Sequence, residues 1–398
     1  MDVHLHHVAT AVPPFAYDQA TAHRVMRDWI GGDRRTDLLL RRIYGASGID
    51  RRHSVVGDFV ASEGADVPLD PPPAEPGDAA TPPLYLLPDG TFRDPGTAER
   101  NDRYREEARR LFVGTAHDAV DGPHPFGPED VTHLITVSCT GFYAPGPDLD
   151  VVHGLGLRPT VERYHLGFMG CYAAFPALRM ARAFCRAEPD AVVLVVLVEL
   201  CSLHLRPSRA TDDVIAASVF ADGAAAMVVS ARAPSGPTLA LDRFVDGLAP
   251  EGASDMAWTI GDHGFAMTLS AYVPRIVGEK AAFALAPLLE GTGVEPAHVP
   301  RWALHPGGRA IVDSVQRGMD LPEGAVADAR AVLAAYGNMS SVTVPFVLAR
   351  LLRDPGPEDE PVLALAFGPG LTVATGLLRW RHPDGTTAAR THAPGGAR

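Results

Sequence analysis

Three residues of this sequence have the types and positions that thiol-dependent acyl transfer requires, and Cys171 is the first of them. It ends an apolar, small-residue run and opens a segment with helical periodicity, HLGFMGCYAAFPALRMARAFC. At a helix N-terminus, unpaired backbone N–H groups and the helix dipole favour the thiolate over the thiol. A thiolate is the nucleophile of covalent acyl transfer. The alternative is a buried structural cysteine, because free cysteines are among the most buried residues.

His305 and Asn338 supply the other two groups. His305 follows a strand-like run in WALHPGGRAIVDSV, and Asn338 lies in a glycine turn before a helix in YGNMSSVTV. Taken alone, the histidine could be structural and the asparagine a helix N-cap. Taken with Cys171, their donors could hold a thioester carbonyl and also the enolate that remains after decarboxylation.

The composition limits the classes of ligand. The chain has 398 residues, is 46% hydrophobic and carries a formal net charge of −13, with no block of like charge. It is long enough for one large core or two coupled ones, and we expect no nucleic-acid partner. Lys280 is the single lysine, so an anionic ligand has to be met by a few arginines.

Cysteine usage and the N-terminus indicate the compartment. No CxxC pair or metal-type spacing is present, so we expect reduced cysteines, no metal and no cofactor. The N-terminus has no basic segment followed by an apolar one, and no apolar stretch is long enough to span a membrane. We therefore expect a cytoplasmic protein without membrane association. The cysteines are Cys139, Cys171, Cys185 and Cys201, and the histidines His4, His6 and His7 read as the start of a strand rather than a metal tract.

Strand-like runs alternate with helical patterns, which predicts an α/β layered protein. Residues 64–99 are rich in proline, glycine and acid, and we expect a surface excursion there before a helix at about 100–120. We expect the tail, 381–398, to be disordered. The predicted strands are 132–139, 190–200, 224–231, 239–245, 302–306, 361–368 and 371–378.

A weak internal repeat predicts two related halves. GFMGCYAAFPALRMAR followed by ADGAAAMVVS resembles YGNMSSVTVPFVLAR followed by AFGPGLTVATGLL. Each pair has a glycine turn, a proline-containing helix, and a second glycine turn near a strand. We therefore expect halves over 1–235 and 236–380, joined near 233–237, with both helix N-termini facing one buried site.

The blocks GFMGC, VFADGAAA, LHPGGRAI, YGNMSS and FGPGLTV occur in one order across about residues 130–380. They resemble the signature blocks of type III polyketide synthases, the chalcone synthase superfamily. The resemblance implies a thiolase-like, five-layered αβαβα fold built from two duplicated halves, and a homodimer. The high alanine, arginine and proline content is consistent with a GC-rich coding sequence, so we expect a bacterial-type member.

The resemblance also implies the chemistry. Cys171 would take a starter acyl group from an acyl-CoA. His305 and Asn338 would bind malonyl-CoA, promote loss of CO₂ and stabilise the enolate that attacks the cysteinyl thioester. Imidazolium at His305 would help to keep Cys171 ionised.

The same resemblance also implies which residues line the substrate pocket. Phe220 and Phe265 match two gatekeeper phenylalanines, and Ala144 matches a residue that reaches into the partner's cavity. His204 and Met256 are larger than their plant counterparts, which disfavours a bulky coumaroyl starter. The remaining substrate-binding positions carried over are Cys201, Gly307, Ala310 and Ser340.

The carrier-binding end departs from the family pattern. Of a basic cluster, only Arg42 matches, and the flanking lysine positions are Leu39 and Ala46. Arg309 adds a charge where plant enzymes have proline. We therefore expect the acyl carrier to be held differently than in plant enzymes, with a carrier protein as an open alternative to CoA as the donor.

The expected function is iterative condensation of malonyl-CoA onto a starter acyl-CoA, followed by cyclisation to a pyrone, resorcinol or similar small aromatic. A condensing enzyme like ketoacyl-ACP synthase III, stopping after one extension, is the enzymatic alternative. A non-catalytic acyl-binding protein of the same fold is the other, and the intact Cys171, His305 and Asn338 set argues against it.

Overall fold

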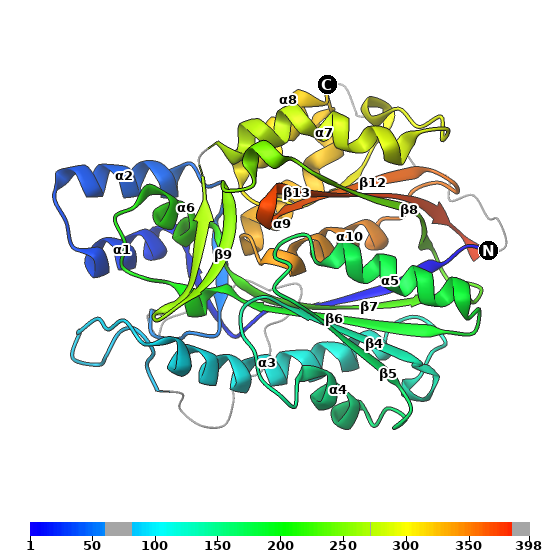
Figure 1. The fold of residues 1–398 in the computed structure, drawn as a ribbon, viewed down its shortest axis with the longest axis horizontal. Helices are drawn as coiled ribbons and strands as arrows, with labels where there is room; N and C mark the ends of the chain where they lie inside the picture. Colours follow the sequence, from blue (N-terminus) through cyan, green and yellow to red (C-terminus); the bar gives the residue numbers. More distant parts are fainter. Residues whose placement is uncertain (60–81, 271, 384–398) are drawn as a thin grey trace, which may run out of the picture.

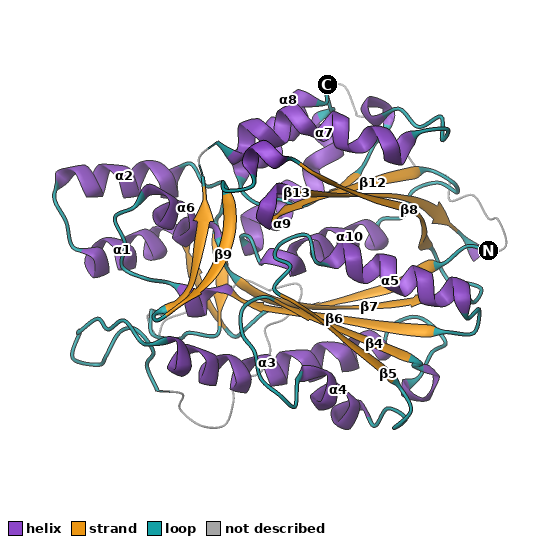
Figure 2. Cartoon of the chain, in the orientation of Figure 1, coloured by secondary structure: helices purple, strands orange, loops and turns teal. Residues whose placement is uncertain are grey.

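The computed structural model describes residues 1–59, 82–270 and 272–383. Two stacked sheets enclose a central layer of helices, and further helices cover both outer faces, which gives five layers, αβαβα (Figures 1 and 2). The expected thiolase-like fold is therefore confirmed. The strands of the two sheets are β1 (His4–Ala11), β4 (His133–Ser138), β5 (Glu162–Gly167), β6 (Val192–Leu200), β7 (Asp222–Ser230), β8 (Thr238–Leu248), β11 (Trp302–Leu304), β12 (Pro361–Gly368) and β13 (Thr372–Arg381).

Strand β1 joins the two sheets. The strand order is β11-β12-β13-β8-β1-β7-β6-β4-β5, and β1 pairs with β7 along its length but with β8 only at His4 and Leu5. The chain passes from one sheet to the other between β7 and β8, across residues 231–237. Strands β4, β6 and β7 are buried at every residue, as expected for strands covered by helices on both faces.

Helices α5 and α10 form the central layer between the sheets (Figure 1). Eight of the eleven residues of α10 are buried, because a central helix has neighbours on nearly every side. Helices α3 and α4 cover one outer face, and α7 and α8 cover the other. These helices are α3 (Thr97–Val120), α4 (Pro147–Leu155), α5 (Ala174–Ala187), α7 (Val273–Leu289), α8 (Arg309–Gly318), α9 (Ala327–Tyr336) and α10 (Thr343–Arg353).

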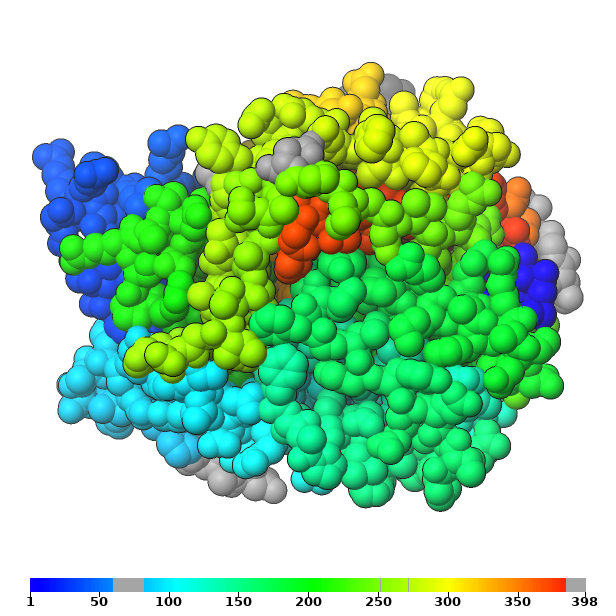
Figure 3. Space-filling model, in the orientation of Figure 1, coloured from blue at the N-terminus to red at the C-terminus, as the bar shows by residue number. Residues whose placement is uncertain are grey.

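A lobe of α1 (Gln19–Ile30) and α2 (Arg34–Gly45) projects from one side, next to α6 (Thr211–Val219) (Figure 3). Asp18 and Asp33 cap α1 and α2, each accepting a hydrogen bond from the backbone N–H three residues later. Two small antiparallel sheets lie at this end, formed by β2 (Phe15–Asp18) with β3 (Arg51–Ser54), and β9 (Met256–Gly261) with β10 (Gly264–Leu269).

The predicted strands all occur, with shifted ends, and the predicted helix begins at Thr97. The expected surface excursion is wrong for Leu84 and Tyr85, which are fully buried, whereas residues 88–91 are exposed as expected. One carboxylate oxygen of Asp58 accepts hydrogen bonds from the N–H groups of Leu84, Tyr85 and Leu86, and thereby holds this segment inside. Residues 64–81 and 384–398 lie outside the described residues.

Two further expectations concern the N-terminus and membranes. His4 and His6 are buried in β1, and burial lowers the pKa of His6 to about 4, so these histidines belong to a strand as expected. Among the described helices, none combines the length and the apolar character needed to cross a bilayer.

Candidate active site

Cys171 lies in a tight turn between β5 and α5, three residues before the helix begins. Gly170 has a φ of 80°, and a Cβ there would lie 2.4 Å from Cδ of Pro369. A Cβ on Gly368 would lie 2.2 Å from Cδ1 of Tyr172. The nucleophile turn and the β12–β13 turn therefore approach so closely that both need glycine.

His305 and Asn338 are held by the backbone of neighbouring elements. The N–H of His305, just after β11, donates to the carbonyl of Leu365 at 2.8 Å. Asn338 Nδ2 donates to the carbonyl of Gly307 at 3.0 Å, and a Cβ on Gly307 would lie 3.4 Å from Nε2 of His305. Asn338 Oδ1 accepts the N–H of Ser340 at 2.9 Å. This fixes the amide and leaves one Nδ2–H available for a substrate oxygen.

Ser340 and Asn338 connect the cysteine to the other half of the fold. Burial raises the pKa of the Cys171 thiol to about 12, while hydrogen bonding from Ser340 and from the Asn338 amide opposes that rise. Ser340 has a φ of 51°, a left-handed conformation that costs energy for a residue with a side chain. The structure thus brings Cys171, Asn338 and Ser340 into contact with one another. Gly307, whose carbonyl accepts from Asn338, connects this group to His305.

The structure does not support the expected imidazolium at His305. His305 is 2% exposed, and burial lowers its pKa to about 3. Its Nδ1 is buried without a hydrogen-bond partner among the described residues. Because burial disfavours both charges, the site without substrate holds a neutral thiol and a neutral imidazole.

Glu199 is a site residue that the sequence reasoning missed. This fully buried carboxylate at the end of β6 accepts the N–H of Cys139 at 3.0 Å, the Thr140 hydroxyl at 3.0 Å and the Ser341 hydroxyl at 2.5 Å. Cys139 Sγ also donates to it at 3.3 Å, and lies 3.5 Å from Oγ of Ser340. The signal was present in the sequence, since Glu199 is the single acid within the apolar run AVVLVVLVEL.

Four expected pocket residues line one small cavity. Cys201, His204, Phe220 and Phe265 surround about 40 Å³ of free space, together with Trp258. This volume is close to that of a single water molecule. The two gatekeeper candidates therefore share a nearly filled space in the substrate-free protein.

His204 holds the wall of this small cavity rigidly. Its Nε2 bonds to the carbonyl of Thr140 at 2.8 Å, its Nδ1 accepts the N–H of Phe265 at 3.0 Å, and its ring stacks on Phe265 at 4.2 Å. Trp258, also not anticipated, donates from Nε1 to the carbonyl of Cys139 at 2.8 Å and meets His204 edge-on. Burial lowers the pKa of His204 to about 3, so the ring is neutral.

Met256 and Ala144 lie apart from the small cavity. Met256 is 5% exposed and pairs with Leu269, on the same face of the β9–β10 hairpin as Trp258. Ala144 is exposed and precedes Pro145 in the loop before α4. Their roles in substrate binding remain predictions.

A larger cavity lies beside the glycine turn that follows His305. Its volume is about 380 Å³, and Gly307 lies at its wall. We call it the entrance cavity. Its lining includes four of the expected substrate-binding residues, Arg42, Gly307, Arg309 and Ala310.

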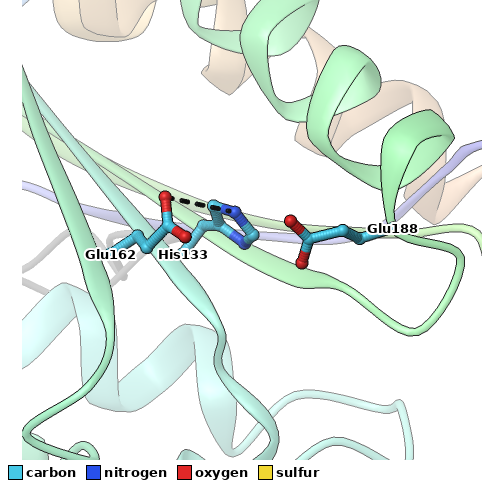
Figure 4. Close-up of side chains that lie close together, drawn as sticks. All are labelled: His133, Glu162 and Glu188. Carbon is cyan, nitrogen blue, oxygen red and sulfur yellow. Dashed lines mark ion pairs between the residues drawn. The ribbon is translucent and has the colours of Figure 1, made fainter.

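The described residues contain one group with metal-type spacing, at the other end of β4 and α5 from the cysteine. His133, Glu162 and Glu188 place one ligand atom each within 4.8 Å of one another (Figure 4). His133 forms an ion pair with Glu162 at 3.8 Å when it is protonated, and both carboxylates are exposed. Ordinary ion pairing accounts for this group.

The layered fold and the buried Cys, His and Asn define the class as an acyl-transferring condensing enzyme of the thiolase fold. Residues 90–233 match the N-terminal domain of chalcone and stilbene synthases, and residues 240–380 match their C-terminal domain. The chain therefore belongs to this family, the type III polyketide synthases, and is an acyltransferase.

Individual relatives agree with this assignment. The chain is 32% identical over 289 residues to an alpha-pyrone synthesis polyketide synthase-like protein of Mycobacterium tuberculosis, covering 71% of this chain and 73% of the relative. It is 30% identical to 1,3,6,8-tetrahydroxynaphthalene synthase of Streptomyces griseus, covering 73% and 77%. The crystal structure of PKS-I from the brown alga Ectocarpus siliculosus superposes with a TM-score of 0.84 at 31% identity, covering 95% of this chain and 98% of that one.

Proposed function

We propose that this protein, as a bacterial-type member of its family, condenses malonyl-CoA units repeatedly onto a starter acyl-CoA and cyclises the product to a pyrone, resorcinol or similar small aromatic. The observation that carries the proposal is the interaction group of Cys171, Ser340 and Asn338. Asn338 bonds to Gly307, which lies next to the His305 ring and also lines the entrance cavity. Each group has a role in the steps below.

Loading begins with two neutral groups. As Cys171 Sγ attacks the starter thioester carbonyl, its proton passes to the neutral imidazole of His305. The resulting thiolate and imidazolium carry no net charge together, so burial opposes this transfer less than either ionisation alone. Collapse of the tetrahedral adduct breaks the bond to CoA sulfur, and the proton on His305 leaves with the CoA thiol.

Extension uses the same donors for a different oxygen. The free Nδ2–H of Asn338 and an N–H of His305 would hold the malonyl thioester carbonyl. When CO₂ leaves, the electron pair of the broken C–C bond forms an enolate whose oxygen these donors stabilise. The enolate carbon attacks the Cys171 thioester, the C–S bond breaks, and the chain leaves as a β-ketoacyl-CoA that can reload Cys171.

The small volume of the cavity is the basis for proposing slim starter acyl groups. Its nearly filled volume and the rigid contacts of His204, Trp258 and Phe265 disfavour a bulky aromatic acyl group. The names of the Mycobacterium and Streptomyces relatives, an alpha-pyrone protein and a naphthalene synthase, support a small cyclic product. A homodimer is proposed with the family.

Mass spectrometry of the products tests the proposal. Purified protein with malonyl-CoA and a panel of short, long linear and aromatic starters should give cyclised products that contain several malonyl-derived units. Products with one unit would favour the single-extension alternative, and the absence of any condensation product would contradict the proposal. A parallel reaction with malonyl-carrier protein tests the carrier.

A further inference from the structure

The small cavity beside Phe220 has two walls that lie outside the main sheets. One wall is the short helical turn η2 (Cys201–His204), and the other is the β9–β10 hairpin, which supplies Trp258 and Phe265. Among the described residues, the hairpin pairs with no further strand, and an isolated two-stranded sheet is only marginally stable. Both walls therefore need support from elements outside the cavity.

Arg100, near the start of α3, supports the first wall and is fully buried. Its Nη1 lies 2.8 Å from the carbonyl oxygens of Leu203 and Leu205, one on each side of His204. The same nitrogen donates to Tyr85 Oη at 2.7 Å, and that hydroxyl donates to the carbonyl that precedes Leu203. Because a guanidinium holds its donors in one rigid plane, Arg100 fixes the backbone on both sides of the His204 ring.

Thr97, the first residue of α3, supports the second wall. Its hydroxyl donates to the carbonyl of Gly261 and accepts the N–H of Gly264 at 2.8 Å. Its own N–H donates to the carbonyl of Asp262 at 2.8 Å. One residue of α3 thus holds the whole turn of the β9–β10 hairpin.

The two walls meet at Gly264. A Cβ there would lie 3.0 Å from Cδ of Arg100 and 3.2 Å from Nδ1 of His204, and its φ of 89° also favours glycine. The next residue, Phe265, donates its N–H to the same Nδ1. A movement at the start of α3 would therefore displace both walls together.

Helix α3 is itself firmly anchored and reaches the cavity only through these walls. Eleven of its 24 residues are buried, and it packs against β1, β6 and β7. Among the described residues, the cavity is lined from within the segments 201–206, 213–220 and 258–267, with none from α3.

We propose that Arg100 and Thr97 are positioning residues that set the separation of the two walls, and thereby the size of the starter acyl group that reaches Cys171. The inference rests on the proposed function, which makes the small cavity an acyl site. Both residues act through the aromatic rings of the walls. A purely structural role would instead change activity toward every starter alike.

Thr97→Val tests this proposal, because Thr97 is only partly buried and valine has nearly the same shape. The rate of Cys171 acylation from coumaroyl-CoA, relative to that from a short acyl-CoA, should rise about fivefold, since loss of the hydroxyl's hydrogen bonds loosens the hairpin. Malonyl-CoA decarboxylation, which uses His305 and Asn338, should keep its wild-type rate. Thr97→Ser retains the hydroxyl and should keep the wild-type acylation ratio.

Thr292→Val is the matched control. The Thr292 hydroxyl makes the same two kinds of hydrogen bond after the end of α7, donating to the carbonyl of Leu289 and accepting the N–H of Val294. Its loss should leave the acylation ratio unchanged. Arg100→Lys keeps the charge but not the planar set of donors, and should shift the ratio in the same direction as Thr97→Val.

Acylation is measured without malonyl-CoA, so its outcome does not depend on condensation. An unchanged ratio in Thr97→Val, including no coumaroylation of either protein, would overturn the inference, as would an equal loss with both starters. A wild-type protein that is acylated but forms no condensation product would contradict the proposed function and leave the positioning roles of Arg100 and Thr97 standing.

Discussion

The catalytic interior and the cavity that Gln19, His23 and Arg309 line between the projecting lobe and α8 treat their buried polar groups in opposite ways. Around Cys171, the Asn338 amide and the Glu199 carboxylate are nearly saturated by hydrogen bonds within the protein. Beside that cavity, the buried atoms Gln19 Oε1 and His23 Nε2 have no hydrogen-bond partner among the described residues.

This difference distinguishes groups that are held in position for catalysis from groups that are free to bind a ligand. Saturated groups are fixed before the substrate arrives, which is what a preorganised oxyanion site requires. Unpaired groups lose little on binding a polar ligand, because they have no protein contacts to give up. In the interior, the unpaired Nδ1 of His305 is the exception, and it belongs to the residue that we expect to exchange protons.

The largest effect should come from the nucleophile. We expect Cys171→Ala to abolish polyketide formation, because the growing chain loses its covalent anchor. Malonyl-CoA decarboxylation should persist, since His305 and Asn338 remain. Chromatography of acetyl-CoA and polyketide from one reaction measures both, and polyketide from this variant would refute the role of Cys171.

Removing the fixed amide should give the next largest effect. Asn338→Ala should slow malonyl-CoA decarboxylation by about 10² to 10³, the usual cost of one oxyanion donor. It should also lower the free energy of unfolding by about 1–3 kcal/mol, because the Gly307 carbonyl and the Ser340 N–H lose a buried partner.

Asn101→Ala is the matched control for the decarboxylation effect. It removes an amide that makes two hydrogen bonds to the backbone of Phe142 at an exposed position. We expect its decarboxylation rate to equal that of wild type. Full decarboxylation by Asn338→Ala would show that the amide is structural only.

Removing the Met256 side chain, which the family resemblance places in the substrate pocket, should have a moderate effect. Met256→Gly should raise the ratio of kcat/KM for coumaroyl-CoA to that for a short acyl-CoA by about tenfold, because overpacking a filled site costs about 1–3 kcal/mol. Ala257→Gly changes the neighbouring residue, whose side chain points to the other face of β9, and should leave the ratio unchanged. If this kcat/KM ratio were equal in wild type and both variants, Met256 would not line the substrate pocket.

The smallest effect concerns the pH dependence of stability. Burial lowers the pKa of His204 from 6.5 to about 3, so between these values the unfolded chain takes up a proton that the folded protein excludes. The free energy of unfolding should therefore fall as pH decreases below 6.5, by up to about 1.4 kcal/mol per pH unit from this group.

His204→Gln should reduce that slope by the contribution of this one group, while its amide replaces the donor to Thr140. The buried His6 and His305, whose pKa values are also lowered, should contribute to the rest. Denaturant titrations at pH 7 and pH 5 measure the slope. Trp258→Phe provides the control, because it removes a neighbouring hydrogen bond but no titratable group, and it should keep the wild-type slope. Identical slopes in wild type and His204→Gln would mean that His204 is not excluded from protonation.

The sequence predicted the layered fold and the three central residues because both depend on local signals. Strands such as β6 are continuous apolar runs, and Cys171, His305 and Asn338 each lie at a boundary between elements. Glu199 had a local signal as well, a lone acid in such a run, which went unused.

Features that depend on distant partners could not be predicted. His204 makes its two hydrogen bonds with Thr140 and Phe265, each more than 60 residues away in the sequence. Residues 84–86 are held by Asp58, a contact that composition does not reveal. The expected charge on His305 was wrong because the degree of burial, which sets the sign of its pKa shift, is a property of the assembled layers.

The central claim is that Cys171 is the cysteine that carries the acyl chain, and an intact-mass measurement tests it most directly. All four cysteines are free and buried, so exposure alone does not distinguish them. After brief exposure to an acyl-CoA, peptide mapping should place one acyl group on Cys171, and Cys139→Ala should acylate like wild type. An acyl group on Cys139, Cys185 or Cys201 instead would contradict the account.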